Sequence, residues 1–291
     1  MSTFSVKIAI VPSKFSPLDP AEETQIRNLV SLFTHNQTLA KSLIPNMDNI
    51  EVKPFLVPAD RLKPGDTYDH LTLMTLLADV NDSKTFVVYV KSSTVSTLDA
   101  NSLVKLIYDL CDNYMKSASG DKSHFDVMYL AKHADRCDLF NPISNVFNNT
   151  VNLVETSAPQ GLQSLLISPD GAHKIKSKLE KPLNYPVSLA LTQLVGKNYL
   201  KALTTTPNVM SFGSQFAVTS SDYIKTHECE TPSNENGKPT PKSSNMSLFI
   251  FIVIFLVVIA IFYFLVTMAS SAKAIPVVAA PNGTYYASTS G

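Results

Sequence analysis

Short segments of alternating or unbroken apolar residues predict strands along the first three quarters of the chain. Residues 4–12 alternate and then become apolar, as in a strand that enters a buried sheet. Residues 85–90 read TFVVYV, which is typical of a central parallel strand. Further strands are predicted at residues 50–57, 125–130, 151–154 and 163–167.

Segments with apolar residues three and four positions apart predict helices between these strands. Each begins with a residue that caps helices well, in two cases followed by a proline that suits the first helical position. The predicted starts are Asp19-Pro20, Asp69, Asp99 and Ser168-Pro169-Asp170. Strands that alternate with helices in this way predict an α/β fold, with one sheet covered by helices on both faces.

A different pattern begins at Ser247 and ends at Met268. These residues contain no charge, amide, proline or glycine. A helix of this length is about 33 Å long and crosses a hydrocarbon core of about 30 Å. We therefore predict a single-pass transmembrane helix at residues 247–269. Three lysines precede it and only Lys273 follows closely, which favours a cytoplasmic N-terminal domain.

These patterns divide the chain into four parts. Residues 1–225 form the predicted α/β domain, and residues 226–246, rich in proline, serine and asparagine, form a tether. The transmembrane helix at 247–269 is followed by a tail at 270–291. The tail is expected to be disordered; its apolar start, AIPVVAAP, leaves open an extended segment that packs on a partner.

Composition narrows the function classes. The 291 residues contain 24 Lys+Arg and 24 Asp+Glu, so the formal net charge is zero and nucleic acid is not an expected partner. The three cysteines are too few for a disulfide scaffold. We therefore expect a reduced compartment and no disulfide-linked partner.

Motifs for catalysis or metal binding are scarce. Neither a glycine-rich phosphate loop nor a GxSxG or HExxH motif occurs. His133 and Cys137, with His124 nearby, supply too few ligands for zinc, and the HECE segment from His227 lies in the tether. Asp135-Arg136-Cys137-Asp138 is expected to form ion pairs in a solvated turn, with the edge of a site as the alternative.

Five segments occur in an order that carries a resemblance. They are the helix and strand from His70 to Val90, the triplet Lys91-Ser92-Ser93, the FDVMYL strand from Phe125, SLLISPDGAHKIKSKL from Ser164, and Pro186-Val187-Ser188 followed by Lys201-Ala202. In this order they resemble glycosyltransferase family 25, which includes bacterial lipooligosaccharide and procollagen galactosyltransferases. The resemblance covers about residues 5–212 and implies a GT-A-like, or Rossmann-like, nucleotide-sugar fold.

The same resemblance implies where a site would lie. The family has a run of acids that holds a divalent metal against the donor diphosphate, and this chain has Lys91, Ser92 and Ser93 there. Ser188 stands where the family has another aspartate. Loss of these carboxylates predicts a degenerate site with no catalytic residue, metal or cofactor. The alternative is that Lys91 replaces the metal in an active enzyme.

The segment FDVMYLAKHADRCDLF, together with the membrane segment, resembles proteins of nucleocytoplasmic large DNA viruses. This implies a membrane-anchored minor capsid or virion protein that links the internal membrane to the capsid shell through an inactive domain. Its partners would be that membrane, through Ser247 to Met268, and capsid or other virion proteins. An active membrane-bound glycosyltransferase and a tail-anchored cellular adaptor are the alternatives.

Overall fold

The computed structural model describes residues 3–13, 18–35, 42, 47–57, 61, 67–117, 121–132, 135–146 and 151–212. The chain divides into two units, Met1–Thr231 and Pro232–Gly291, and the described residues all lie in the first. No helix among them is long and apolar enough to cross a membrane. The transmembrane segment predicted at 247–269, the tether and the tail lie outside the described residues.

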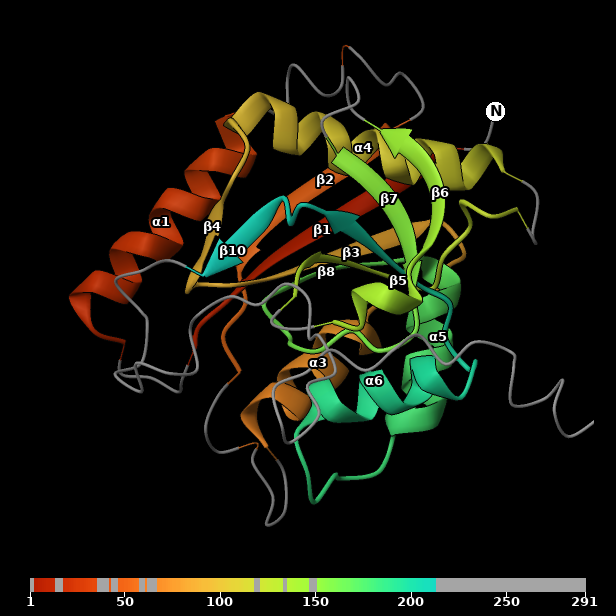
Figure 1. Ribbon diagram of the computed structural model, residues 1–291. Helices are drawn as coiled ribbons and strands as arrows, with labels where there is room; N and C mark the ends of the chain where they lie inside the picture. The colour runs from red at the N-terminus through yellow and green to blue at the C-terminus, as the bar shows by residue number, and fades with distance from the viewer. Residues whose placement is uncertain are drawn as a thin grey trace, which may run out of the picture. The chain divides into compact units, whose positions relative to one another are not determined.

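One large sheet of eight strands forms the centre of the first unit (Figure 1). Its strand order is β2-β1-β3-β8-β5-β9-β7-β6. The strands are β1 (Phe4–Val11), β2 (Met47–Pro54), β3 (Thr85–Lys91), β5 (Val127–Ala131), β6 (Asn141–Val146), β7 (Val151–Thr156), β8 (Ser164–Ile167) and β9 (Ala202–Thr206). A second, two-stranded sheet pairs β4 (Thr94–Ser96) with β10 (Met210–Phe212).

The large sheet is mixed. Strands β2, β1 and β3 are parallel, and β9 is parallel to β5. Strand β8 lies between β3 and β5 and is antiparallel to both, so β3 and β5 point the same way. The carboxyl ends of β1, β3 and β5 therefore meet the amino end of β8 at one edge of the sheet.

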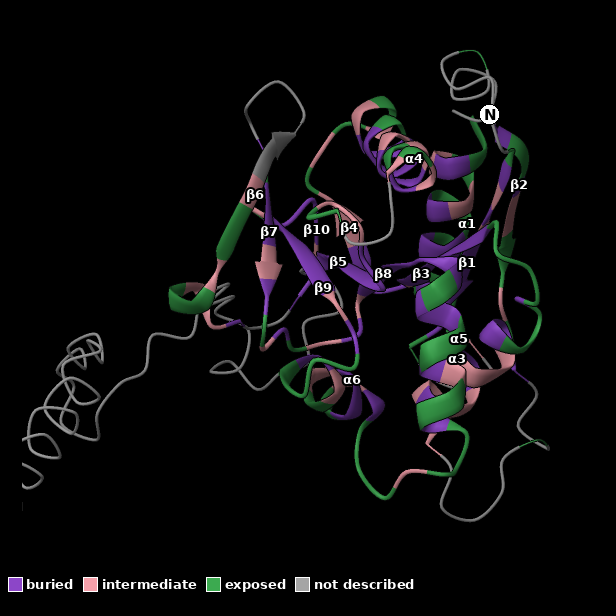
Figure 2. Ribbon diagram, turned by 90° about the vertical axis from the view of Figure 1, so that its right-hand side faces the viewer, coloured by how far each residue is buried: buried purple, intermediate pink, exposed green. Residues whose placement is uncertain are grey.

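Helices cover both faces of this sheet (Figure 2). On one face α1 (Pro20–His35) and α4 (Ala100–Lys116) pack on side chains such as Val6, Ile8 and Val88. On the other, α3 (Tyr68–Ala78), α5 (Pro169–Leu179) and α6 (Val187–Gly196) pack on Val87, Tyr89 and their neighbours. Successive residues of a strand point to opposite faces, so central strands with a core on each face must be apolar throughout. The predicted α/β fold with helices on both faces is confirmed at this level.

The helix starts follow the predicted capping chemistry with one exception. Asp99 caps α4 by accepting a hydrogen bond from Ser102 N at 3.0 Å, and Ser168 caps α5 through Gly171 N at 3.0 Å. The predicted cap at Asp69 is wrong, because Thr67 Oγ1 accepts from His70 N and caps α3. Asp69 instead lies in the first turn of α3, where the positive end of the helix dipole favours a carboxylate.

Close packing of α5 on the sheet depends on Gly171. A Cβ atom at this position would lie 1.9 Å from the backbone oxygen of Asp126, next to β5. Only a residue without a side chain allows this approach. The buried Asp126 carboxylate also accepts bonds from Lys174 Nζ of α5 and from Lys201 N, so this point joins a helix to two strands.

We predict that Gly171→Ala destabilises the domain by about 1–3 kcal/mol, because helix and strand must move apart. Thermal and denaturant unfolding of the full chain in detergent would measure the change. Gly196→Ala is the matched control, since its Cβ would meet Ser157 O at an ordinary 3.7 Å. Equal effects of the two substitutions would contradict the role given to the close contact.

Candidate functional site

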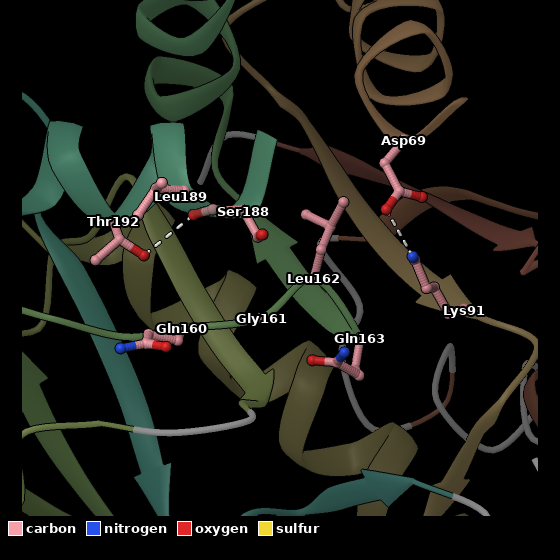
Figure 3. Close-up of a pocket in the computed structure, with 9 residues that line it drawn as sticks. All are labelled: Asp69, Lys91, Gln160, Gly161, Leu162, Gln163, Ser188, Leu189 and Thr192. Atoms are coloured by element: carbon pink, nitrogen blue, oxygen red, sulfur yellow. Dashed lines mark hydrogen bonds and ion pairs between the residues drawn. The ribbon is translucent and has the colours of Figure 1, made fainter. Parts of the chain in front are cut away.

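The sequence-predicted positions lie at the edge where the carboxyl ends of β1 and β3 meet. Lys91 is the last residue of β3, and Ser92 and Ser93 lead from it into β4. Ser188 lies in the first turn of α6, far away in the sequence. Lys91 and Ser188 line the same pocket, of about 310 Å³ (Figure 3). The fold thus brings together two positions that the family resemblance had singled out.

Four parts of the chain build the wall of this pocket. They are the first turn of α3, the end of β3, the loop before β8 and the start of α6. The lining residues are Asp69, Lys91, Gln160, Gly161, Leu162, Gln163, Ser188, Leu189 and Thr192. Figure 3 shows Asp69 and Lys91 on one side and the residues of α6 on the other. Gly161 has a φ of 108°, a left-handed conformation that explains glycine in this loop.

An ion pair occupies the position where the family resemblance implied metal-binding acids. Lys91 Nζ donates to Asp69 Oδ2 at 2.8 Å, with 15% and 34% of the two side chains exposed. These two residues are the charged ones among the nine lining residues, so their formal charges cancel. Because the pair is partly exposed, we expect it to contribute no more than about 1 kcal/mol to stability.

Uncharged residues, some polar and some apolar, form the rest of the pocket wall. Thr192 Oγ1 has two backbone acceptors, Pro159 O at 2.5 Å and Ser188 O at 3.0 Å, so its one proton is committed to the backbone. The backbone oxygen of Gln163 accepts from Lys91 N at 2.8 Å and holds the loop against β3. The side-chain oxygen of Gln163 is buried without a hydrogen-bond partner among the described residues. The pocket therefore offers neutral hydrogen-bonding groups beside a closed ion pair.

Ser92 and Ser93 do not line this pocket, although they follow Lys91 directly. Both are buried, and Ser92 Oγ donates to the carboxylate of Glu22 at 2.6 Å. The three residues of the predicted triplet therefore do not act as one unit. Sequence reasoning also missed Asp69 and Glu22 as partners of this triplet. The one feature that could have indicated these carboxylates is their place in the first turns of two helices.

Two tyrosines lie close to these carboxylates. Burial raises the pKa of Tyr68 to about 12, and the negative charges of Asp69 and Glu22 add to the shift. Burial also raises the pKa of Tyr89 well above its ordinary value, with further contributions from Asp69 and Tyr68. Both phenols are thus uncharged near neutral pH and cannot serve as bases there.

The Asp135-Arg136-Cys137-Asp138 segment is only partly the solvated turn that was expected. Arg136 and Asp138 form an exposed bidentate pair at 2.9 and 2.8 Å. Asp135, by contrast, is buried; it accepts from Thr156 Oγ1 at 2.7 Å and lies 3.8 Å from the buried ammonium of Lys132. The expectation of a solvated turn is therefore wrong for Asp135.

In the part of the chain that the structure describes, the histidine and cysteine candidates form no metal site. His124 stacks on the ring of Tyr114, with centroids 3.9 Å apart, and burial is the main reason why its pKa is lowered. Among the described residues, no group of three histidine, cysteine or acidic side chains could hold a metal ion. His133 and the segment from His227 to Glu230 lie outside them.

The expectation of reduced cysteines needs correction. Cys137 is disulfide-bonded, whereas Cys111 is a buried free thiol. The count of three cysteines argued against a disulfide scaffold of several bridges, but it did not exclude a single bond. For Cys137, the expectation of a free thiol is wrong.

Comparisons with known proteins leave the family of this chain open. No protein-family model matches the chain, and no curated protein matches it. Among solved structures, a mannose-6-phosphate isomerase from Helicobacter pylori is similar, with 12% identity and a TM-score of 0.27 over 71% of this chain and 90% of that one. A likeness this weak carries no argument about function.

We predict that Asp135→Ala destabilises the protein by about 3–5 kcal/mol, because it leaves the Lys132 ammonium buried opposite an empty space. Asp138→Ala is the matched control in the same segment. Its partner, Arg136, is exposed, so the expected loss is below about 1 kcal/mol. Denaturant unfolding of both variants would measure the difference, and a small effect at Asp135 would show that Lys132 finds other compensation.

Proposed function

We propose that this chain is a membrane-anchored minor capsid or virion protein of a large DNA virus. Its α/β domain would bind other virion proteins and would not catalyse sugar transfer. The observation that carries the non-catalytic part is the ion pair between Lys91 and Asp69, which lies where the resemblance to glycosyltransferase family 25 implied metal-binding acids.

The ion pair explains why the proposed domain would not catalyse sugar transfer, because it leaves no free carboxylate charge in the described pocket wall to bind a metal. A divalent cation needs several oxygen ligands, and carboxylates supply the negative charge that keeps it bound beside a diphosphate. Asp69 is the one acid among the lining residues, and its charge is balanced by the ammonium of Lys91 at 2.8 Å. A metal at this point would have to displace Lys91 and would still lack further carboxylates from the described wall.

The finer features of the proposal rest on the sequence. The GT-A-like, or Rossmann-like, description is supported by a pocket at the carboxyl ends of parallel strands, where ligands of open α/β sheets bind. The membrane anchor is supported by the charge-free residues 247–268, and the cytoplasmic domain by the lysines before them. The capsid partner and the internal virion membrane are supported by the sequence resemblance alone.

One observation favours an active glycosyltransferase as the second candidate. Lys91 and Ser188 line a common pocket of about 310 Å³, a volume within the usual range for small-molecule sites. If a ligand separated Lys91 from Asp69, its ammonium would face a diphosphate in place of a metal.

Calorimetry of the full chain in detergent with UDP- and GDP-sugars, with and without manganese, separates the two candidates. We expect no saturable heat, because one ion-paired lysine neutralises little of a diphosphate. Saturable binding that Lys91→Ala abolishes would favour the transferase instead. Lys197→Ala, an exposed lysine after α6 and outside the described pocket wall, is the control for a nonspecific loss of positive charge.

Fractionation of purified virus particles tests the structural role. We expect the chain in the particles and its release by detergent together with the internal membrane, because residues 247–268 are predicted to span it. Absence from the particles would end this proposal. A membrane location in cells that express the chain without infection, combined with that absence, would favour the cellular adaptor.

A further inference from the structure

Three side chains form a hydrogen-bonded chain at the carboxyl ends of β1 and β3. Ser13 follows β1, Ser92 follows β3, and Glu22 belongs to the first turn of α1. The two strand ends are also joined directly, because Ser92 N donates to Val11 O at 2.7 Å. Glu22 and Ser92 are buried, with 2% and 0% of their surface exposed, whereas Ser13 is exposed.

The direction of each hydrogen bond in this chain is fixed. Glu22 Oε1 accepts from Ser13 N and from Ser92 Oγ, both at 2.6 Å. Ser92 has a single hydroxyl proton, which is committed to Glu22. The 3.1 Å contact between the two serine hydroxyls must then have Ser13 as the donor and Ser92 as the acceptor. Ser13 N and Ser92 Oγ thus both donate to Oε1 of Glu22, and the Ser13 hydroxyl donates to the Ser92 hydroxyl.

The position of Glu22 in its helix makes this arrangement notable. Glu22 is the third residue of α1, and Asp19 Oδ1 accepts from its backbone N at 2.8 Å as a helix cap does. In a common capping box, a glutamate at this position turns back to the cap residue. Here its Oε1 reaches across to two strand ends. The carboxylate therefore joins α1 to the sheet while it remains near the positive end of the helix dipole.

We propose that Ser13 N and Ser92 Oγ form a cradle for a small oxyanion, and that Glu22 fills it as an internal ligand. Charge-assisted hydrogen bonds from a backbone N–H and a buried hydroxyl suit a carboxylate or phosphate oxygen. The cradle accepts an external anion only when the Glu22 carboxylate is absent. This inference goes beyond the proposed function and does not depend on it, because it explains how polar groups at the ends of β1 and β3 are satisfied.

Replacement of the internal ligand tests the proposal on the full chain in detergent. Glu22→Ala should lower Tm by about 4–8 °C, because Ser13 N and Ser92 Oγ lose the carboxylate acceptor that they share. Sodium acetate at about 100 mM should restore at least half of that loss, since a ligand that binds only the folded state raises Tm. Sodium chloride at the same ionic strength should not. Wild type should respond equally to both salts.

Three further variants define the cradle. Glu23→Ala, the adjacent residue, removes only an exposed pair with Arg27 and should change neither Tm nor the response to acetate. Glu22→Gln fills the space without charge and should not respond to acetate. Glu22→Ala combined with Ser92→Ala should lose most of the rescue, because one donor is gone.

Equal responses of Glu22→Ala and wild type to acetate, or none in either, would overturn the inference. If Glu22→Ala does not fold, its refolding yield in acetate against chloride is the readout, and equal yields would overturn it as well. Nucleotide-sugar binding by the wild type would defeat the proposed function but leave the acetate result unaffected. No gain in the Tm of Glu22→Ala in acetate would overturn the cradle and leave the proposed function unaffected.

Discussion

The central strands of this sheet are buried on both faces, and the polar chemistry of the domain follows from that constraint. Every side chain of β5 and β8 is buried, as are all those of β3 except Lys91. A buried ionised group that lacks a partner is costly. Charged side chains are therefore excluded from the interiors of β3, β5 and β8 and appear where these strands end. The edge formed by the ends of β1 and β3 is such a place.

Two carboxylates from helix starts satisfy the groups at this edge. Asp69 of α3 pairs with Lys91, and Glu22 of α1 accepts from Ser92 and from the backbone of Ser13. The two interactions differ in exposure and so in strength. The first is partly open to solvent, where ion pairs contribute little. The second is enclosed at Glu22 and Ser92, where an unmade hydrogen bond costs the full desolvation of its donor. Glu22 therefore helps to hold α1 at the strand ends, whereas Asp69 mainly balances the charge of Lys91 in the pocket.

Local chemistry was predictable from the sequence, and long-range chemistry was not. Asp99 and Ser168 cap their helices as predicted because a cap binds a backbone N–H three residues away. Asp69 failed as a cap because Thr67, two residues earlier, offers the same acceptor chemistry. The hydrophobic pattern does not predict strands β4, β6, β9 and β10. Two of them have only three residues, too short for a periodic signal, and pair with each other.

The candidate site shows the same division. The order of segments named Lys91 and Ser188, and the fold places both at one pocket. The order of segments did not show that Lys91 lines the pocket whereas Ser92 faces Glu22. Successive residues at a strand end point in opposite directions. Nothing local marks Asp135 as buried. That carboxylate is enclosed by Thr156, 21 positions later, and by Lys132, so its environment exists only after β5 and β7 have come together.

A site edge whose formal charges cancel is compatible with the proposed role of the domain in binding other proteins. The exposed large apolar side chains among the described residues are Leu56, Leu139, Tyr185, Leu189 and Tyr199. Standard interfaces bury about 800 Å² per partner, so such isolated residues alone do not make a tight one. Tethering changes that requirement. Residues 226–246, if they behave as the flexible tether that their composition predicts, span about 25 Å. Under the proposed membrane anchoring, a tethered domain would meet a partner on the same surface at a high effective concentration, and weak contacts would then suffice.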